Sequence, residues 1–520
     1  MAPNELPTTA DSNGARTRPP SRGAWIALLA FVLVLHLFGL GKHGLFEPDE
    51  GRYANMGAEW TEFDDHSWLE PTLADVGHFD KPPLIYWFTG SSFLLFGRNE
   101  WAARLPSFLG GLLALAGIAL LAWRASGPRA AWWAVLAGAT TIQIWALSHL
   151  LSPDMLMGGF CTLGAGLVLW PRSEDSSLRR RAYWIAGALC WSLAWWTKAT
   201  AALVPLAAIT AALAITGRRD RLRALKPLRL LLVILALGLP WYLLMAHRHP
   251  ELWDFFLRRE LAGRVVGHAD DRDEFFGFQF LIAALFWLPW WPVLVRPIVR
   301  AWKSASGAGR ERLKGLPWEP LAAVLVVAVY SLIASKLPTY TLPGAPFVAV
   351  AVGGLLARES FTFRRWPARA AAVATLGLVA VSLVSPRIES SIGGNSSVRL
   401  AMAEARSRGA DWIVCDEFWP GAEFYFGENV LYVDEADHLQ VAGSAGQEPA
   451  EHFVSKRDIA GRLAGLEGEI WIVDRFTPEP SPRHWRETVL GTESGSARPE
   501  PVRVGDFRLQ KVTPSGSPAR

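Results

Sequence analysis

Long apolar runs separated by short polar segments dominate the chain up to about residue 385. Each run has about 16 to 20 residues, close to the ~20 that an α-helix needs to cross the hydrocarbon core of a bilayer. The pattern predicts a mainly α-helical, polytopic membrane protein. We expect eleven spans, at residues 24–41, 105–123, 130–149, 153–171, 182–197, 199–216, 230–246, 276–295, 319–335, 341–357 and 368–385.

Lysine and arginine gather in every second short loop between these runs, for example in "GRRDRLRALKPLR" (217–229) and "RESFTFRRWPAR" (358–369). Short basic loops stay in the cytoplasm, so their positions set the orientation of the chain. We expect the N-terminus in the cytoplasm, the first span as a retained signal anchor, and the segment after the last span outside.

One apolar run, residues 84–97, is too short for a span: as a helix it would measure roughly 21 Å against a hydrocarbon core of ~30 Å. If it crossed, the later basic loops would face outward. We expect an interfacial or re-entrant helix on the outer side. Pro82 and Pro83 suit its start, because the first turn of a helix does not need their N–H groups.

The pattern changes after residue 385, where no further span is found. Helical patterns alternate with short strand-like runs, which predicts a small extracytoplasmic α/β domain with a flexible end. The expected helices are at 398–408 and 455–465, and the expected strands are at 411–416, 429–434 and 469–474.

Composition agrees with a membrane protein: 51% of the 520 residues are hydrophobic, and 26 are tryptophans, which suit a membrane interface as well as helix packing. The three cysteines lie far apart and match neither a metal motif nor a disulfide framework. The net charge of +4 is modest, and we expect membrane lipids but no nucleic acid among the partners.

The outer loops, 42–104 and 247–275, hold unusual ionisable residues, and charges at a membrane boundary are costly unless they are paired or wet. "LFEPDEGRYA" (45–54) has two interpretations. Asp49 and Glu50 suit the start of a helix. Alternatively, they are outward carboxylates for general base catalysis or cation stabilisation, with Arg52 as a phosphate or carboxylate partner.

Two further outer motifs leave similar alternatives open. In "FDKPPLIYW" (79–87), Lys81 either snorkels from an interfacial helix or is a fixed cation at the level of a lipid phosphate. In "ELAGRVVGHADDR" (260–272), charged residues recur every four positions and would share one helix face, as a solvated surface, a phosphate site or a metal site. These residues are Glu260, Arg264, His268 and Arg272, and the metal alternative pairs His268 with Asp80, although no ligand spacing is diagnostic.

Three short outer turns add Asp154, Lys198, Lys336 and Tyr340 to the same side. Their motifs are "SPDM", "WTKAT" and "SKLPTYTLP". Each alone is usually just a loop between two helices. Their gathering on one side suggests a site.

Together, "EPDEGRYA", "FDKPPLIYW", "SPDM", "WTKA" and "SKLPTYTLP" resemble, in this order, the motifs of bacterial lipid A aminoarabinose transferases. These belong with the protein O-mannosyltransferase-like glycosyltransferases of the GT-C fold. The resemblance covers roughly residues 24–360. It is specific to the superfamily and not to a sugar or an acceptor.

The resemblance implies sugar transfer from a polyprenyl-phosphate donor to a lipid A-like glycolipid or another cell-envelope acceptor, by a single inverting displacement. This would occur on the periplasmic side of a bacterial inner membrane. With the span pattern and its change after residue 385, we expect three domains: a cytoplasmic tail (1–22), a GT-C transmembrane catalytic domain (23–385) and the extracytoplasmic α/β domain (386–520).

The resemblance implies roles for Asp49, Lys81, Asp154, Lys198 and Tyr340, and the other outer charges add further candidates. We expect catalytic roles for Asp49, Asp154 and Glu50, and substrate-binding roles for Lys81, Arg52, Lys198, Arg264, Arg272, Lys336 and Tyr340. Asp80 and His268 are candidate ligands for a divalent metal, and no cofactor is required by the motifs.

Three other functions compete with this interpretation. A protein O-glycosyltransferase differs only in its acceptor. A transporter or flippase for a lipid-linked anionic substrate predicts charges near the bilayer midplane and repeated halves, and the sequence has neither. An envelope assembly protein would bind a partner through its C-terminal domain.

Overall fold

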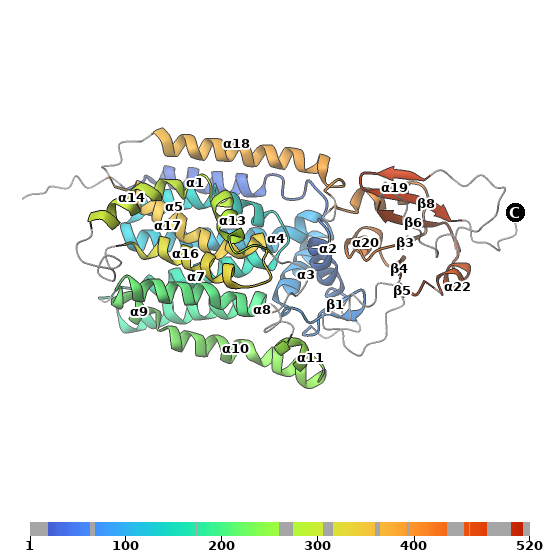
Figure 1. Ribbon diagram of the computed structural model, residues 1–520, viewed down its shortest axis with the longest axis horizontal. Coiled ribbons are helices and arrows are strands. Elements are labelled where there is room, and N and C mark those ends of the chain that lie inside the picture. Colours follow the sequence, from blue (N-terminus) through green and yellow to red (C-terminus); the bar gives the residue numbers. More distant parts are fainter. Residues whose placement is uncertain are drawn as a thin grey trace, which may run out of the picture.

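The computed structural model describes residues 19–62, 68–172, 174–258, 274–304, 316–358, 365–392, 396–433, 452–456, 458–475 and 501–512. Its long helices run side by side in one bundle, and a C-terminal sheet lies beyond one end of that bundle (Figure 1). Two helices, α2 (Asp49–Glu59) and α3 (Leu84–Phe96), lie between the bundle and the sheet, with the short strands β1 (Thr72–Leu73) and β2 (Val76–Gly77). The short helix expected at 84–97 is therefore present and begins directly after Pro83.

Helices occupy every apolar run in which a span is expected, so the mainly α-helical fold class is confirmed. By length and composition, five of the described helices could each cross a membrane, and α5 with α6 would make a sixth span across a 63° bend. The full number of eleven spans stays a prediction. The bundle contains α1 (Arg22–Leu37), α4 (Glu100–Ser126), α5 (Pro128–Ala139), α6 (Ile142–Ser148), α7 (Pro153–Leu169), α8 (Ser177–Ile215), α9 (Arg219–Leu225), α10 (Pro227–Arg248), α11 (Leu252–Asp254), α13 (Phe278–Phe286), α14 (Pro292–Ser304), α16 (Trp318–Leu332), η3 (Pro338–Gly344), α17 (Ala345–Leu356) and α18 (Arg365–Ile388).

Helix α8 consists of two helical segments that form a hairpin, with Lys198 at the turn between them. Its 39 residues would extend for roughly 58 Å if straight. Instead, Lys198 leaves the helical conformation (φ −155°, ψ 78°). Trp184, near the start of α8, donates a hydrogen bond to the carbonyl of Leu225, beyond its end, at 3.3 Å. The break expected between residues 197 and 199 is confirmed, and it places the buried Lys198 at the same end of the bundle as α2.

The single span expected at 276–295 is wrong. Helix α13 ends at Phe286, and α14 begins only at Pro292 and continues to Ser304, into a segment expected to be a basic loop. Pro289 lies between the two helices. A proline lacks the N–H group that a continuing helix needs, so an apolar pattern that runs through prolines does not make one helix.

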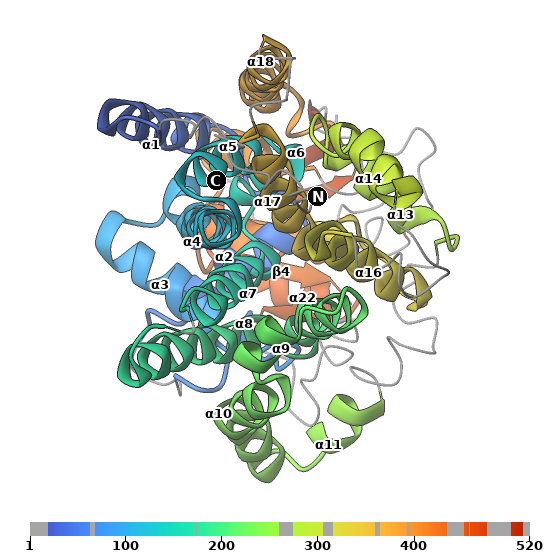
Figure 2. The ribbon, with the colours of Figure 1, turned by 90° about the vertical axis from the view of Figure 1, so that its left-hand side faces the viewer.

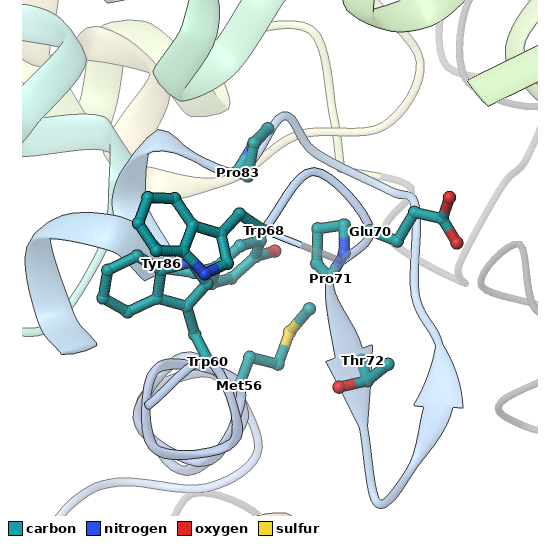
Figure 3. Close-up of a pocket in the computed structure, with 8 residues that line it drawn as sticks. All are labelled: Met56, Trp60, Trp68, Glu70, Pro71, Thr72, Pro83 and Tyr86. Atoms are coloured by element: carbon teal, nitrogen blue, oxygen red, sulfur yellow. The ribbon is translucent and has the colours of Figure 1, made fainter. Parts of the chain in front are cut away.

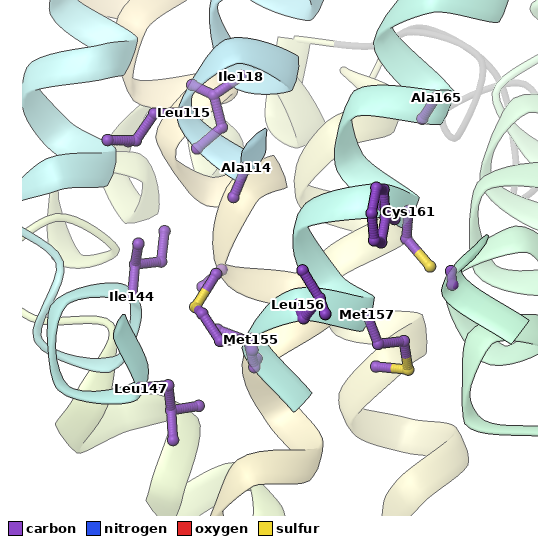
Figure 4. Packing of buried hydrophobic residues seen from close by; sticks show 14 of the residues in the cluster. Ala114, Leu115, Ile118, Ile144, Leu147, Met155, Leu156, Met157, Cys161 and Ala165 are labelled. Carbon is purple, nitrogen blue, oxygen red and sulfur yellow. The ribbon is translucent and has the colours of Figure 1, made fainter. Parts of the chain in front are cut away.

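Helices α4 and α7 form a tightly packed pair in the interior of the bundle (Figure 2). A Cβ atom on Gly159 would lie 2.2 Å from the carbonyl oxygen of Gly110, so only glycine permits this approach. Next to the crossing, Ala114, Ile118 and Leu156 pack in one apolar cluster (Figure 4). The pair fixes the N-terminal turn of α7 against α4.

The C-terminal domain contains a six-stranded sheet of order β5-β4-β3-β6-β8-β7. Strands β5, β4, β3 and β6 are parallel to one another. Strand β8 pairs antiparallel with β6 and forms an antiparallel hairpin with β7 at the edge of the sheet. The expected α/β domain is confirmed, and the three expected strands correspond to β3, β4 and β6. The elements are α19 (Arg399–Ser407), β3 (Trp412–Cys415), α20 (Gly421–Phe426), β4 (Val430–Val433), β5 (Phe453–Val454), α22 (Ile459–Ala464), β6 (Ile470–Arg475), β7 (Val502–Val504) and β8 (Phe507–Val512).

Candidate active site

Asp49 and Arg52 form an ion pair at the start of α2. The Arg52 guanidinium donates a hydrogen bond to Asp49 Oδ1 at 2.6 Å. Asp49 lies in the first turn, as expected for a residue that favours the positive end of the helix dipole. Its side chain is 56% exposed, whereas that of Arg52 is 20% exposed. The Asp49 carboxylate is therefore fixed by one arginine and remains accessible to a substrate.

Glu50, the next residue, has a different environment. It is buried, and Arg104 donates hydrogen bonds to both of its oxygens, from Nε at 2.8 Å and from Nη2 at 2.9 Å. The backbone N–H groups of Leu151 and Phe46 donate to the same carboxylate, at 2.6 and 3.0 Å. Burial alone would raise the pKa of Glu50, but the Arg104 guanidinium and the hydrogen bonds outweigh it and lower that pKa. Because protein groups occupy both oxygens, the geometry favours a positioning role for Glu50, and the catalytic role expected for it stays a prediction.

Arg104 is the main residue that the sequence analysis missed. It is fully buried, and it also donates hydrogen bonds to the carbonyl oxygens of Leu40, His43 and Gly44, at 3.0, 2.9 and 2.9 Å. It thereby joins α4 to the loop before α2 and, through Glu50, to the loop before α7. A signal was available, because an arginine at the start of an apolar run needs a buried partner.

Asp80 and Lys81 form a second ion pair directly before α3, with Lys81 Nζ 2.5 Å from Asp80 Oδ2. His78 Nε2 lies 3.4 Å from Asp80 Oδ1, and the Lys81 ammonium lies 5.7 Å from the ring centre of Tyr53. Burial opposes ionisation of Asp80, yet the charges of Lys81, His78 and Arg52 hold the pKa of its carboxyl well below the usual range. Asp80 stays ionised and keeps the ammonium in place.

A third cluster joins the turns that carry Asp154, Lys198 and Tyr340. Lys198 Nζ donates hydrogen bonds to both Asp154 oxygens, at 2.8 and 3.0 Å. The Ser152 hydroxyl donates to Asp154 Oδ2 at 3.1 Å, and Lys198 Nζ lies 5.1 Å from the ring centre of Tyr340. Turns from α7, α8 and η3 therefore meet.

The three clusters are neighbours. Asp80 lies close enough to Arg52 for their charges to interact, and Lys81 lies close enough for its charge to act on Asp154. Charges of alternating sign thus continue across four sequence motifs at one end of the bundle. In order, they belong to Asp49, Arg52, Asp80, Lys81, Asp154 and Lys198.

Lys336, another expected site residue, has its described hydrogen bonds outside this network. Lys336 donates hydrogen bonds to the carbonyl oxygens of Glu274 and Ala334, at 2.9 and 3.2 Å. Arg264, His268 and Arg272 lie outside the described residues, so the metal site that would join His268 to Asp80 stays a prediction. Within the described part of the chain, no group of three His, Cys, Asp or Glu side chains could hold a metal ion.

A small open hollow lies at the start of α3, next to Pro83 and Tyr86 (Figure 3). Aromatic and proline rings form most of its wall, and its space of about 310 Å³ is partly open to solvent. Glu70 at its edge is paired with Arg248 and lies 3.3 Å from His249. The lining residues are Met56, Trp60, Trp68, Glu70, Pro71, Thr72, Pro83 and Tyr86.

Residues 80–243 match the family described as dolichyl-phosphate-mannose-protein mannosyltransferase. The fold resembles the crystal structure of ArnT from Cupriavidus metallidurans bound to undecaprenyl phosphate, with a TM-score of 0.75 and 20% sequence identity. That match covers 96% of this chain and 100% of the other chain. The protein is therefore a multi-pass membrane protein with the ArnT-like GT-C fold.

Sequence similarity points to the same group of enzymes. The chain is 28% identical over 328 residues to an undecaprenyl phosphate-α-4-amino-4-deoxy-L-arabinose arabinosyl transferase from Photorhabdus laumondii, covering 62% of this chain and 57% of the relative. It is 28% identical over 338 residues to the enzyme of that name from Edwardsiella ictaluri, covering 64% of this chain and 59% of the relative. The chain thus spans less than two thirds of the length of these curated relatives. The resemblance to aminoarabinose transferases that its motifs predicted is confirmed.

Proposed function

We propose that the protein is a membrane glycosyltransferase that moves a sugar from a polyprenyl-phosphate carrier to a glycolipid acceptor of the lipid A type. One observation carries the proposal: Lys81 and Arg52, with the accessible Asp49 beside them, lie at one end of a bundle whose fold is that of a protein crystallised with undecaprenyl phosphate. A cation next to an accessible carboxylate is what this reaction needs.

The cations act on the leaving group. As the bond between the anomeric carbon and the carrier phosphate breaks, negative charge grows on the phosphate oxygen. Lys81, oriented by Asp80, and Arg52 stabilise that charge where it develops. The lipid tail of the carrier remains in the membrane, while α3 holds Lys81 at the level of the phosphate.

The carboxylates act on the other reactants. Asp49 accepts the proton of an acceptor hydroxyl while the acceptor oxygen forms its bond to the anomeric carbon. An acceptor that is already an ionised phosphate needs no base. Asp154, held by Lys198, stabilises the positive character of the sugar ring during the displacement. A single displacement of this kind inverts the anomeric configuration.

We further propose that the protein lies in a bacterial inner membrane, with its N-terminus in the cytoplasm and the C-terminal domain in the periplasm. The basic helix α9, "RDRLRAL", supports this orientation, because it lies at the end of the bundle opposite α2 and α3 (Figure 1). The matched family description names protein mannosyltransferases, and this favours a protein as the second candidate acceptor.

Binding of undecaprenyl phosphate to the purified protein tests the carrier site. Native mass spectrometry should detect one bound molecule on the wild-type protein and at least tenfold weaker binding by Lys81→Met. Lys303→Met is the matched control, because Lys303 is exposed on α14, away from the site. Equal binding by Lys81→Met and the control would refute the proposed carrier site.

A further inference from the structure

Helix α2 and the residues directly before it form hydrogen bonds with the C-terminal domain. The backbone N–H of Gly421, the first residue of α20, donates a hydrogen bond to Glu47 Oε1 at 3.0 Å. Asn55 Nδ2 donates to Glu423 Oε2 at 2.6 Å, and the hydroxyl of Tyr425 accepts from the N–H of Leu45 at 2.7 Å. These contacts flank the Asp49–Arg52 pair on both sides along the chain.

The backbones of α2 and α20 touch at this point. A Cβ atom on Gly51 would lie 2.6 Å from the backbone nitrogen of Gly421, and a Cβ atom on Gly421 would lie 2.1 Å from Glu47 Oε1. The Glu47 carboxylate lies against both glycines at this contact. Because Gly51 lies between Asp49 and Arg52 in sequence, a movement of α20 is transmitted to the ion pair.

The interface buries several carboxyl groups around one amide. Asn55 Nδ2 donates to Glu59 Oε1 at 3.0 Å as well as to Glu423. The N–H of Ala74 also donates to Glu59 Oε1, at 2.7 Å. Glu47, Glu59 and Glu423 are all buried. Two carboxyl groups that share one amide in a buried site repel each other when both are ionised.

An ion pair between the two parts of the chain lies beside these carboxyls. His452 of the C-terminal domain lies 3.5 Å from Asp75, in the turn between β1 and β2. Among the described residues, the other titratable or charged groups that face the cluster are Glu50, Arg52, Glu62, Arg98, Cys415, Glu428, Tyr432 and Arg475.

We propose that the C-terminal domain positions the Asp49–Arg52 pair for sugar transfer, and that it docks on α2 only while the buried carboxyls at this interface hold protons. Glu47, Asn55, Glu59 and Glu423 are then positioning residues. The link to sugar transfer rests on the proposed function, whereas docking itself is measured without it.

The direction of the pH effect follows from the environment of each group. Burial raises the pKa of Glu47 and of Glu59 from 4.5 to about 8 in the docked state. In an undocked state these carboxyls return to their ordinary pKa, so docking is strongest below pH 4.5 and weakens until the pH passes 8. The hydrogen bond with Asp75 raises the pKa of His452 from 6.5 to about 9, so its contribution is also lost as the pH rises through 9.

Hydrogen–deuterium exchange of the α2 peptide in the full-length protein, in lipid nanodiscs, measures docking. After correction for intrinsic exchange rates, protection of wild-type α2 should fall at least tenfold between pH 6 and pH 9. The double variant Glu47→Gln/Glu59→Gln should lose much less protection over this range than the wild type, because its amides cannot ionise and only the remaining groups, such as His452, still titrate. Glu404→Gln, at a partly exposed residue of α19 outside this interface, is the matched control and should behave as the wild type. Constant protection in the wild type, or a normal pH response in the double variant, would overturn the proposal.

A second variant avoids the buried positions, where a substitution can impair folding. Asp75 has a half-exposed side chain, and Asp75→Asn should speed α2 exchange at pH 6 by removing the partner of His452. Unchanged exchange would count against docking through this pair. Sugar transfer, followed in the same samples, should fall with α2 protection in the wild type and should fall much less by pH 9 in the double variant. If exchange behaves as described but neither the wild type nor any variant transfers sugar at any pH, the proposed function is wrong and the docking proposal is retained. If sugar transfer occurs but does not change with the protection of α2, the positioning role is wrong.

Discussion

Replacing Glu50 by glutamine should mainly lower the stability of the protein, whereas replacing Asp49 by asparagine should mainly abolish sugar transfer, although the two carboxylates are neighbours in sequence. Glu50 neutralises Arg104 in a fully buried site. Removing one partner of a buried ion pair costs about 3–5 kcal/mol, because the other charge remains uncompensated. Since glutamine keeps one acceptor oxygen, we expect Glu50→Gln to lose about 3 kcal/mol, the lower end of that range.

Asp49→Asn should barely affect stability. The Asp49 side chain is 56% exposed, and exposed ion pairs contribute only about 0–1 kcal/mol. Its loss should instead appear as loss of sugar transfer, because the carboxylate is the proposed base. Thermal unfolding in detergent, followed by tryptophan fluorescence, should show a midpoint lowered by roughly 6–12 °C for Glu50→Gln, at the 2–4 °C per kcal/mol of larger domains, and by much less for Asp49→Asn.

The double variant Glu50→Leu/Arg104→Met is the control for this reasoning. Removing both charges together should restore part of the stability that Glu50→Gln loses, since apolar groups of similar volume can replace a buried ion pair. If Glu50→Gln unfolds at the wild-type midpoint and is nevertheless inactive, Glu50 is catalytic and the positioning role assigned to it is wrong.

Two further predictions concern the bundle. Lys198→Met should lower the free energy of unfolding by about 3–5 kcal/mol, because it leaves the Asp154 carboxylate without its cation; a wild-type unfolding midpoint would show that this pair does not stabilise the fold. Gly159→Ala should cost about 1–3 kcal/mol, because its Cβ would lie 2.2 Å from the Gly110 carbonyl oxygen. Gly377→Ala is the matched control, since no atom lies within 4 Å of its added Cβ, and equal midpoints for the two variants would contradict the close packing of α4 and α7.

The sequence predicted the helices and strands that are determined by the pattern of neighbouring residues. The apolar runs became helices, and β3, β4 and β6 lie where short β-branched and aromatic runs predicted them. The hairpin of β7 and β8 was missed, although "VRVGDFRLQ" alternates around Gly505, whose φ of +59° suits a tight turn. The break between α13 and α14 was also missed, although Pro289 and Pro292 mark it.

The role of Glu50 could not be predicted from its neighbourhood. Its partner, Arg104, lies 54 positions further along the chain. Successive helix residues point in directions about 100° apart, so Asp49 faces outward while Glu50 faces the interior. The same limit applies to the docking face of α2, because Glu47 meets Gly421 across 374 positions. Contacts of this kind depend on how the bundle and the C-terminal domain assemble.

The central claim, sugar transfer from a polyprenyl-phosphate carrier, is tested most directly by mass spectrometry of polyprenyl-phosphate sugars in membranes. Four strains are compared: a deletion strain, and the same strain restored with wild type, Asp49→Asn or Glu404→Gln. A glycosylated carrier should accumulate in the deletion and Asp49→Asn strains but not with wild type or Glu404→Gln, and its mass would give the class of sugar. Carrier pools that are the same in all four strains would contradict the claim.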